Sequence, residues 1–368
     1  MSLRTRGEIC EFNYGMGLPE GKRAPGRIDV YGSNGPVGNH SEAITDRPTI
    51  VIGRKGSVGE VNFSDTGCWP IDTTYYVARS CTAQHHKWLF YALRKLCLPR
   101  LNKATGVPGL NRSDGYEQKL LVPPINEQER IAAILDQADS LRRLRQRAID
   151  RLNSLGQAVF NKMFGEQAGN PKRWRTGELM EIVLDDDQIN YGVVQPGVET
   201  ESGVPLVRVA DLLAPAIDIA ALKKIDAEIE SKYKRSRLRG DEVLVGCVGS
   251  IGAVTIAHSG MRGVNIARAV GRIPVDPRKA NPQFIAEHLK TRSSQNYFRA
   301  ETRTVAQPTL NIKQLKETPI MLPPLEKQKE FSHIAREVEK EKTSSSAYLE
   351  SLNAFFSTLQ NRAFRGEL

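Results

Sequence analysis

One pattern occurs twice in this sequence, at a separation of 200 residues from Gln128 to Gln328. Residues 121–128 are LVPPINEQ and residues 321–328 are MLPPLEKQ, and after each the apolar residues recur at alternating steps of three and four. That spacing predicts a long helix with a heptad seam. Proline cannot continue a helix backwards, so each helix should begin after its proline pair. We therefore predict two helical segments, 125–166 and 325–368.

A helix of about 38 residues is about 57 Å long and needs a partner along its seam. The repeat suggests that the two helices are partners of each other, as an antiparallel coiled coil with pseudo-twofold symmetry. Polar residues interrupt the seam at Arg145, Glu341 and Ser345. The predicted seam residues are Ile131, Ile134, Leu141, Leu152 and Leu155 in the first helix, and Phe331, Ile334, Val338, Leu352, Phe355 and Leu359 in the second.

The segments before each helix, 1–124 and 167–324, also resemble each other. Residues 52–59 (IGRKGSVG) match residues 245–252 (VGCVGSIG), and the tripeptide Asn-Tyr-Gly occurs at 13–15 and at 190–192. Apolar, β-branched runs predict strands at 28–31, 49–52, 72–77, 205–209 and 242–245. Helical spacing is found at 87–98 and 282–289. The predicted fold class is α+β: two α/β domains separated by the two long helices, with an internal pseudo-twofold repeat.

The glycine-bearing loops at 53–59 and 246–252 have two compatible interpretations. One is a tight turn between strands that needs positive φ. The other is a loop whose backbone amides, with Ser57 or Ser250, approach a DNA phosphate. Neither loop is a Walker A sequence, because the Lys-Ser/Thr pair is missing, and neither has the spacing of a dinucleotide-binding fingerprint.

We find no catalytic set and no metal site in the sequence. The two proline pairs lead into helices and do not form an Asn-Pro-Pro-aromatic loop that could grip a flipped base. The six histidines lack metal-ligand spacing, and the acidic run 185–187 is interpreted as a solvated turn rather than a cation site. We therefore predict no catalytic residues and no metal ligands.

The formal net charge of +10 and the pI near 9.3 favour a polyanionic partner, nucleic acid first and an acidic membrane second. Five scattered cysteines and the absence of a membrane-spanning run or signal-peptide core favour a soluble protein of the cytoplasm. Basic loop residues could anchor phosphates and planar or amide side chains could read bases. The candidate DNA-binding residues are Lys22, Arg23, Arg27, Tyr31, Asn34, Lys55, Ser57, Lys103, Tyr191, Gln195, Lys234, Arg235, Ser250, Asn265, Arg268, Arg303, Thr304 and Gln307.

Two variable α/β units, each closed by a Pro-Pro-Ile/Leu-x-x-Gln helix start, resemble the specificity (S) subunit of type I restriction–modification systems. The glycine loops and the heptad helices add to the resemblance, which covers nearly the whole chain. It implies that 1–124 and 167–324 are target recognition domains that read the two halves of a split, asymmetric site in double-stranded DNA. It also implies that 125–166 and 325–368 are conserved helical spacers.

The same resemblance implies partners. The helices would dock methyltransferase (M) subunits, two of them, and through these the restriction (R) subunits. S-adenosylmethionine, ATP and Mg would be bound by those partners and no cofactor by this chain. Two alternatives stay open: a non-catalytic coiled-coil scaffold that bridges proteins, and the DNA-binding remnant of a methyltransferase–specificity fusion.

Overall fold

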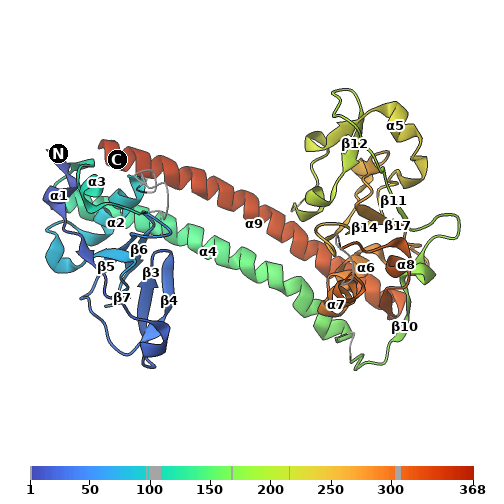
Figure 1. The fold of residues 1–368 in the computed structure, drawn as a ribbon, viewed down its shortest axis with the longest axis horizontal. Coiled ribbons are helices and arrows are strands. Elements are labelled where there is room, and N and C mark those ends of the chain that lie inside the picture. Colours follow the sequence, from blue (N-terminus) through green and yellow to red (C-terminus); the bar gives the residue numbers. More distant parts are fainter. Residues whose placement is uncertain (1, 97, 99–108, 167–168, 215, 303–307) are drawn as a thin grey trace. The chain divides into compact units, whose positions relative to one another are not determined.

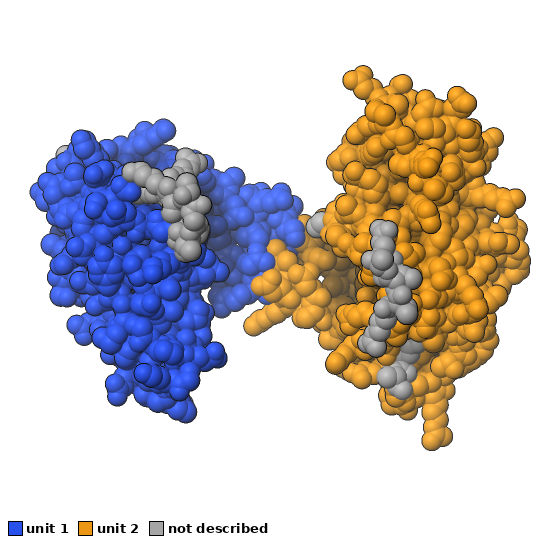
Figure 2. Space-filling view, viewed as in Figure 1, with its two compact units in different colours: residues 1–147, 345–368 blue, residues 148–344 orange. Residues whose placement is uncertain are grey.

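The computed structural model describes residues 2–96, 98, 109–166, 169–214, 216–302 and 308–368. The chain forms two compact units, which Figure 2 shows in blue and orange: unit 1 is residues 1–147 with 345–368, and unit 2 is residues 148–344. Each unit holds a globular part and a stretch of both long helices, α4 (Ile125–Phe164) and α9 (Leu325–Arg365), which are labelled in Figure 1.

The globular part of unit 1 contains three small sheets. The largest is antiparallel, and the second sheet contains one antiparallel and one parallel pair of strands. The strand orders are β2 (Asn13–Tyr14), β8 (Thr74–Val77), β5 (Thr49–Gly53), β6 (Val61–Ser64); then β4 (Gly35–His40), β3 (Ile28–Gly32), β7 (Trp69–Pro70); then β1 (Ser2–Thr5), β9 (Lys119–Val122).

Unit 2 has the same three sheets with the same order and strand directions. They are β11 (Asn190–Tyr191), β17 (Val270–Ile273), β14 (Val243–Gly246), β15 (Val254–Ile256); then β13 (Lys223–Ile225), β12 (Val204–Val207), β16 (Asn265–Ile266); then β10 (Arg175–Glu178), β18 (Pro319–Leu322). The predicted internal repeat is therefore confirmed at the level of strand pairing.

The repeated glutamine joins each long helix to its globular part. Gln128 is buried; its Nε2 donates to the Pro123 carbonyl at 2.9 Å and its Oε1 accepts the His85 backbone N–H at 2.9 Å. His85 is the N-cap of α2 (His86–Lys95), whose residues Trp88 and Leu89 lie in the core of unit 1. One buried amide thus satisfies a carbonyl before α4 and a free N–H at the start of α2.

Gln328 makes the equivalent contacts in unit 2. Its Nε2 donates to the Pro323 carbonyl at 2.8 Å, and its Oε1 accepts the Asn281 N–H at 2.9 Å. Asn281 caps α6 (Pro282–Leu289), whose bounds match the predicted helix. The Pro-Pro-x-x-x-Gln pattern is therefore a structural junction between long helix and domain.

Five shorter α-helices also belong to the described fold. They are α1 (Arg6–Ile9) and α3 (Arg112–Tyr116) in unit 1, and α5 (Ala227–Ser231), α7 (Arg292–Glu301) and α8 (Ile312–Lys316) in unit 2. Arg6 is fully buried, and within the described residues its guanidinium nitrogens have no hydrogen-bond partner. It packs over the Phe12 ring at 4.8 Å, and burial lowers its pKa to about 10. Leu179, which follows β10 as Arg6 follows β1, is an ordinary buried leucine.

Within unit 1 the two long helices run antiparallel. Arg130 of α4 donates to the Leu368 carbonyl, Arg142 donates to Asn353 Oδ1 at 2.7 Å, and Arg145 donates to Ser345 Oγ at 3.3 Å. Later residues of α4 thus meet earlier residues of α9. In unit 2 the end of α4 meets the start of α9 through Phe160, Phe164 and Phe331.

The seam differs from the predicted one. Ile131 and Phe331 are buried, and Ile134, Leu152, Val338, Leu352 and Leu359 are half-buried. The prediction is wrong at the exposed residues Leu141, Leu155, Ile334 and Phe355. In their place the buried residues are Leu135, Ala138, Ile149, Phe160, Ala335, Ser345 and Phe356.

The physical reason for the difference is that each helix covers a globular core as well as the other helix, so Leu135 and Ala138 join the core cluster that contains α2. A straight helix also drifts by about 20° per heptad relative to a strict seven-residue repeat. Among the described helices, none is both long and apolar enough to cross a lipid bilayer.

Candidate nucleic-acid interface

The two glycine loops have the same backbone structure and close antiparallel hairpins, β5–β6 and β14–β15. Gly59 N–H bonds the Gly53 carbonyl at 2.8 Å, and Gly252 N–H bonds the Gly246 carbonyl at 2.9 Å. The central glycines, Gly56 and Gly249, have φ of +77° and +76°, a conformation that favours glycine. The predicted strand-to-strand turn is confirmed.

In unit 1 this loop packs beside the β3–β4 hairpin tip, which carries the exposed Asn34. The Thr73 carbonyl joins the two segments, because it accepts the Ser33 hydroxyl at 2.7 Å and the backbone N–H groups of Arg54 and Lys55 at 2.9 and 3.1 Å. The structure thus brings together three predicted residues, Asn34, Lys55 and the half-buried Ser57, on one exposed edge.

Beside this edge lies a cluster that the sequence analysis did not select. The Tyr14 side chain is 54% exposed, and the guanidinium carbons of Arg54 and Arg112 lie 5.2 and 5.6 Å from its ring centre. Tyr75 packs behind Tyr14 with ring centres 5.1 Å apart. Among the described residues, neither arginine forms an ion pair with a carboxylate, so both charges remain available to an external anion or acceptor. Tyr14, Arg54 and Arg112 come from three segments far apart in sequence, so no local sequence signal could have revealed the cluster.

Unit 2 presents its cations elsewhere. A cavity of about 470 Å³ is lined by a basic run and by the residues around Asn190. Lys234 and Arg235 are exposed there, and Asn190 Nδ2 donates to the Arg235 carbonyl at 3.1 Å. Asn190 Oδ1 is buried without a hydrogen-bond partner among the described residues, which leaves one acceptor of this side chain unused.

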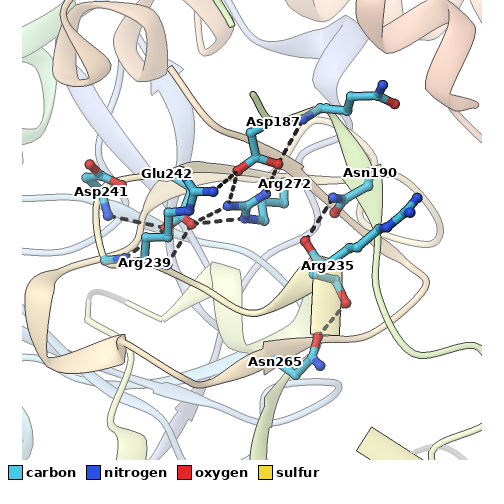
Figure 3. Close-up of polar contacts among 11 residues, drawn as sticks. Asp187, Asn190, Arg235, Arg239, Asp241, Glu242, Asn265 and Arg272 are labelled. Atoms are coloured by element: carbon cyan, nitrogen blue, oxygen red, sulfur yellow. Dashed lines mark hydrogen bonds and ion pairs between the residues drawn. The ribbon is translucent and has the colours of Figure 1, made fainter. Parts of the chain in front are cut away.

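The base of that cavity is a charge network, shown in Figure 3. Arg272 is 1% exposed and forms two bonds with Asp187, at 2.9 and 2.7 Å, while its Nε donates to Glu242 at 2.9 Å. Arg239 approaches Asp187 at 3.3 Å. The prediction of a solvated acidic turn at 185–187 is therefore wrong for Asp187, whose carboxylate is committed to two arginines.

The carboxylates of this network are held ionised. Burial alone raises the pKa of Asp187, but hydrogen bonds from Arg272 and the Gln188 N–H outweigh it and lower the pKa below its ordinary value. The pKa of Glu242 is likewise lowered, because backbone N–H groups of Arg239 and Gly240 and the charge of Arg272 outweigh the effect of burial. The network carries balanced charge and fixes β11 against β17, so it positions Asn190.

Two predicted base-reading residues are buried in unit cores, and the prediction is wrong for both. Tyr31 is 6% exposed and packs with Val51 and Cys68, and burial raises its pKa. Asn265 is fully buried; its Oδ1 accepts the Ser236 hydroxyl at 2.6 Å and its Nδ2 donates to Glu230 at 2.9 Å. Neither side chain is accessible for a hydrogen bond to a base.

Other predicted residues fall into three groups. Tyr191 is half-buried and donates its hydroxyl to the Leu310 carbonyl at 2.5 Å, and Arg23 donates to the Val37 carbonyl at 2.7 Å. Exposed positions are occupied by Lys22, Arg27, Gln195 and Arg268, and Ser250 is half-buried in its loop. Outside the described residues lie Lys103, Arg303, Thr304 and Gln307. In the described part of the chain, no group of three or more metal-ligating side chains could hold a metal ion.

Comparison with known proteins decides the family. Residues 2–154 and 185–351 both match the type I restriction modification DNA specificity domain. The chain belongs to this family. The two matched ranges contain the two glycine loops and both Pro-Pro-x-x-x-Gln junctions, so the repeat found in the sequence and in the sheets is a repeat of the specificity domain.

Two curated members of the specificity family are similar to this chain. One is the type I restriction enzyme EcoBI specificity subunit of Escherichia coli, 33% identical over an alignment of 319 residues that covers 77% of this chain and 66% of that protein. The other is the MjaVIII specificity subunit of Methanocaldococcus jannaschii, 23% identical over an alignment of 271 residues that covers 68% of this chain and 63% of that protein. The chain thus spans slightly less than two thirds of the length of each relative.

Solved structures show the same fold. The S subunit of a type I restriction–modification system from M. genitalium superposes with a TM-score of 0.67 at 18% identity, covering 99% of this chain and 96% of that one. A chain from a structural study of assembly and conformational transition in the type I system gives a TM-score of 0.55 at 17% identity, with coverage of 100% and 98%. The predicted fold class is confirmed.

Proposed function

We propose that this specificity-family chain is the DNA-recognition subunit of a type I restriction–modification complex and reads a split, asymmetric site. The observation that supports it best is the duplicated specificity domain with one backbone plan and two different sets of exposed cations. Unit 1 carries the exposed Lys55 beside the half-buried Arg54 and Arg112, whereas unit 2 exposes Lys234 and Arg235. Two such surfaces suit two different half-sites, with 1–124 and 167–324 as target recognition domains and 125–166 and 325–368 as spacers.

Replacing residues 1–124 with the equivalent segment of another family member tests this assignment. We expect the methylated motif to change in one half only, because 167–324 keeps its side chains and its contacts. The measurement is sequencing of methylated sites in cells that carry the chimera with its methyltransferase. The reciprocal exchange of 167–324 is the matched control and should alter the other half. A change in both halves after one exchange would contradict the two-reader proposal.

The chain itself is proposed to be non-catalytic, with S-adenosylmethionine, ATP and Mg bound by partner subunits. This rests on family membership and on the absence from the sequence of a P-loop and of a base-gripping loop. The purified chain should transfer no methyl group to DNA, and addition of the methyltransferase subunit should confer transfer and tighten a gel shift. Unaided transfer would favour a methyltransferase–specificity fusion, and loss of DNA binding in every combination would favour a scaffold.

The long helices are proposed to dock the methyltransferase subunits. Apolar side chains that face solvent on a soluble helix mark a surface for a protein partner. Leu155 is 41% exposed and Phe355, at the equivalent position of the repeat, is 55% exposed. Additional exposed apolar residues on these helices are Leu141, Leu144, Ile334 and Tyr348. Equivalent exposed residues in the two copies favour two equivalent docking sites.

Leu155→Glu and Phe355→Glu are each expected to remove one of two methyltransferase subunits, because a carboxylate would be buried in an apolar contact. Native mass spectrometry of the reconstituted complex gives the stoichiometry directly. Ser154→Glu and Ala354→Glu, at the neighbouring exposed positions, are the matched controls and should leave two subunits bound. If Leu155→Glu and Phe355→Glu both retained two methyltransferase subunits, the result would contradict the docking proposal.

A further inference from the structure

The internal repeat indicates which side chains the fold itself needs, because equivalent positions of the two units share one backbone structure. Arg54 and Cys247 occupy equivalent sites, since their carbonyls accept the N–H groups of Leu110 and Leu310 at 2.8 and 2.9 Å. Arg112 and Ile312 are each the first residue of a short helix capped by an asparagine, Asn111 or Asn311.

The strand register supplies a third pair of equivalent positions. Gly53 pairs with Thr74 and Gly246 with Val270, so Tyr75 corresponds to Gly271. At these three sites unit 2 therefore builds the same backbone with a cysteine, an isoleucine and a glycine. The two arginines of unit 1 are therefore not needed to form the fold. Tyr75 is different, because it is buried in the core and donates its hydroxyl to the Leu110 carbonyl, a bond that Tyr191 makes to the Leu310 carbonyl in unit 2.

The two arginine side chains are nevertheless held in fixed positions. Arg54 Nη2 donates to the Asp72 carbonyl at 2.6 Å, and its guanidinium carbon lies 5.2 and 5.8 Å from the ring centres of Tyr14 and Tyr75. Arg112 lies 5.6 and 5.8 Å from the ring centres of Tyr14 and Tyr116. A guanidinium that is ordered before binding loses less conformational entropy when it binds.

The chemistry of the ligand follows from three features. The cluster is partly exposed: Tyr14 is 54% exposed and both arginines are half-buried. Within the described residues neither arginine is paired with a carboxylate, so the cluster suits an external acceptor. Planar guanidinium forks in a fixed orientation match a pair of acceptors, such as guanine O6 and N7 in the major groove. Phosphate anchoring is sequence-blind and would be useful in both units, whereas the positions of Arg54 and Arg112 hold a cysteine and an isoleucine in unit 2. The cation near the equivalent tyrosine of unit 2, Tyr191, is Arg268, which comes from a different position of the chain. Reading two different half-sites requires different side chains at equivalent positions of the two units.

We propose that Arg54 and Arg112, stacked on Tyr14, are the specificity-determining pair that recognises guanine in the half-site read by unit 1. This rests on the proposed DNA-recognition function. Lys55, the next residue of the same loop as Arg54, contributes a sequence-independent phosphate contact beside them. Cys247 and Ile312 give unit 2 no such pair, so its half-site is read by other residues.

The test uses the reconstituted complex of this chain with its methyltransferase and the motif found by methylation sequencing. Binding is measured to the native site and to duplexes with 7-deazaguanine, which lacks the N7 acceptor, at each guanine of the unit 1 half-site. We expect at least one replacement to weaken wild-type binding about 5- to 150-fold. Arg54→Gln or Arg112→Gln should abolish that sensitivity while leaving discrimination in the other half unchanged.

The double variant Arg54→Cys, Arg112→Ile places the unit 2 residues in unit 1 and should fold, because unit 2 folds with them. Lys55→Ala is the comparator and should weaken all sequences about equally and reduce the salt slope by about one. The inference is overturned if no guanine is sensitive to 7-deaza replacement, or if the arginine variants behave like Lys55→Ala. Failure of the wild-type complex to bind DNA would instead refute the proposed function.

Discussion

Arg272→Met is expected to lower the free energy of unfolding of unit 2 by about 3–5 kcal/mol, which is the usual cost of removing one partner from a buried ion pair. Arg272 lies between Asp187 and Glu242, whose side chains are 11% and 0% exposed. Without its guanidinium two buried carboxylates repel each other, and three hydrogen bonds are lost. The β11–β17 pairing, which includes Asn190 and Arg272, should loosen first.

Hydrogen exchange of unit 2 amides is the appropriate measurement, because it reports stability locally and does not require the whole chain to unfold in one two-state step. Arg175→Met is the matched control: Arg175 pairs with Glu181 in the same unit, but its side chain is 67% exposed, so the change should cost at most about 1 kcal/mol. Equal effects of the two substitutions would show that the Arg272 network contributes no more than a surface pair.

The long helices and the repeat were predictable because their signals are local. A proline pair, a glutamine five residues after the first proline and heptad spacing all lie within one stretch of chain, and α4 and α9 begin at Ile125 and Leu325. The role of Gln128 was not predictable, since its partner N–H belongs to His85, 43 residues earlier. The buried face of each helix was also mispredicted. Leu141 and Phe355 fit the heptad pattern, but Leu135 and Phe356 are the residues that pack into a globular core.

The candidate interface was predictable by region but not by residue. Basic loops indicated a nucleic-acid partner, yet side-chain type alone could not separate the exposed Asn34 from the buried Asn265. The side-chain amide of Asn265 is already hydrogen-bonded to Glu230 and Ser236, which come from a different segment. The Arg54–Tyr14–Arg112 cluster joins three segments far apart in sequence, so it appears only when the strands are paired.

The second large effect is an acid destabilisation of unit 2 through His288. The side chain is fully buried and accepts the Met321 N–H on Nε2 at 3.0 Å, so its proton is on Nδ1, which faces Ser294 Oγ at 3.3 Å. Burial lowers its pKa to about 4, whereas an unfolded histidine has a pKa of about 6.5. Between these values the unfolded state binds more protons, so stability is full above about pH 6.5 and is lost as pH falls towards 4.

The expected loss from this single group is about 3 kcal/mol across that interval. His288→Gln keeps an acceptor near Met321, and the variant should be less stable than the wild type at pH 7. Because glutamine cannot be protonated, the stability of the variant should change little between pH 6.5 and 4.5. Free energies of opening, obtained from hydrogen exchange of unit 2 amides at several pH values, give the pH dependence of stability for the wild type and for the variant. His333→Gln, at an exposed position of α9, should retain the wild-type slope. If His288→Gln keeps it as well, the acid sensitivity arises from other groups, and protonation of this buried imidazole does not limit the stability of unit 2.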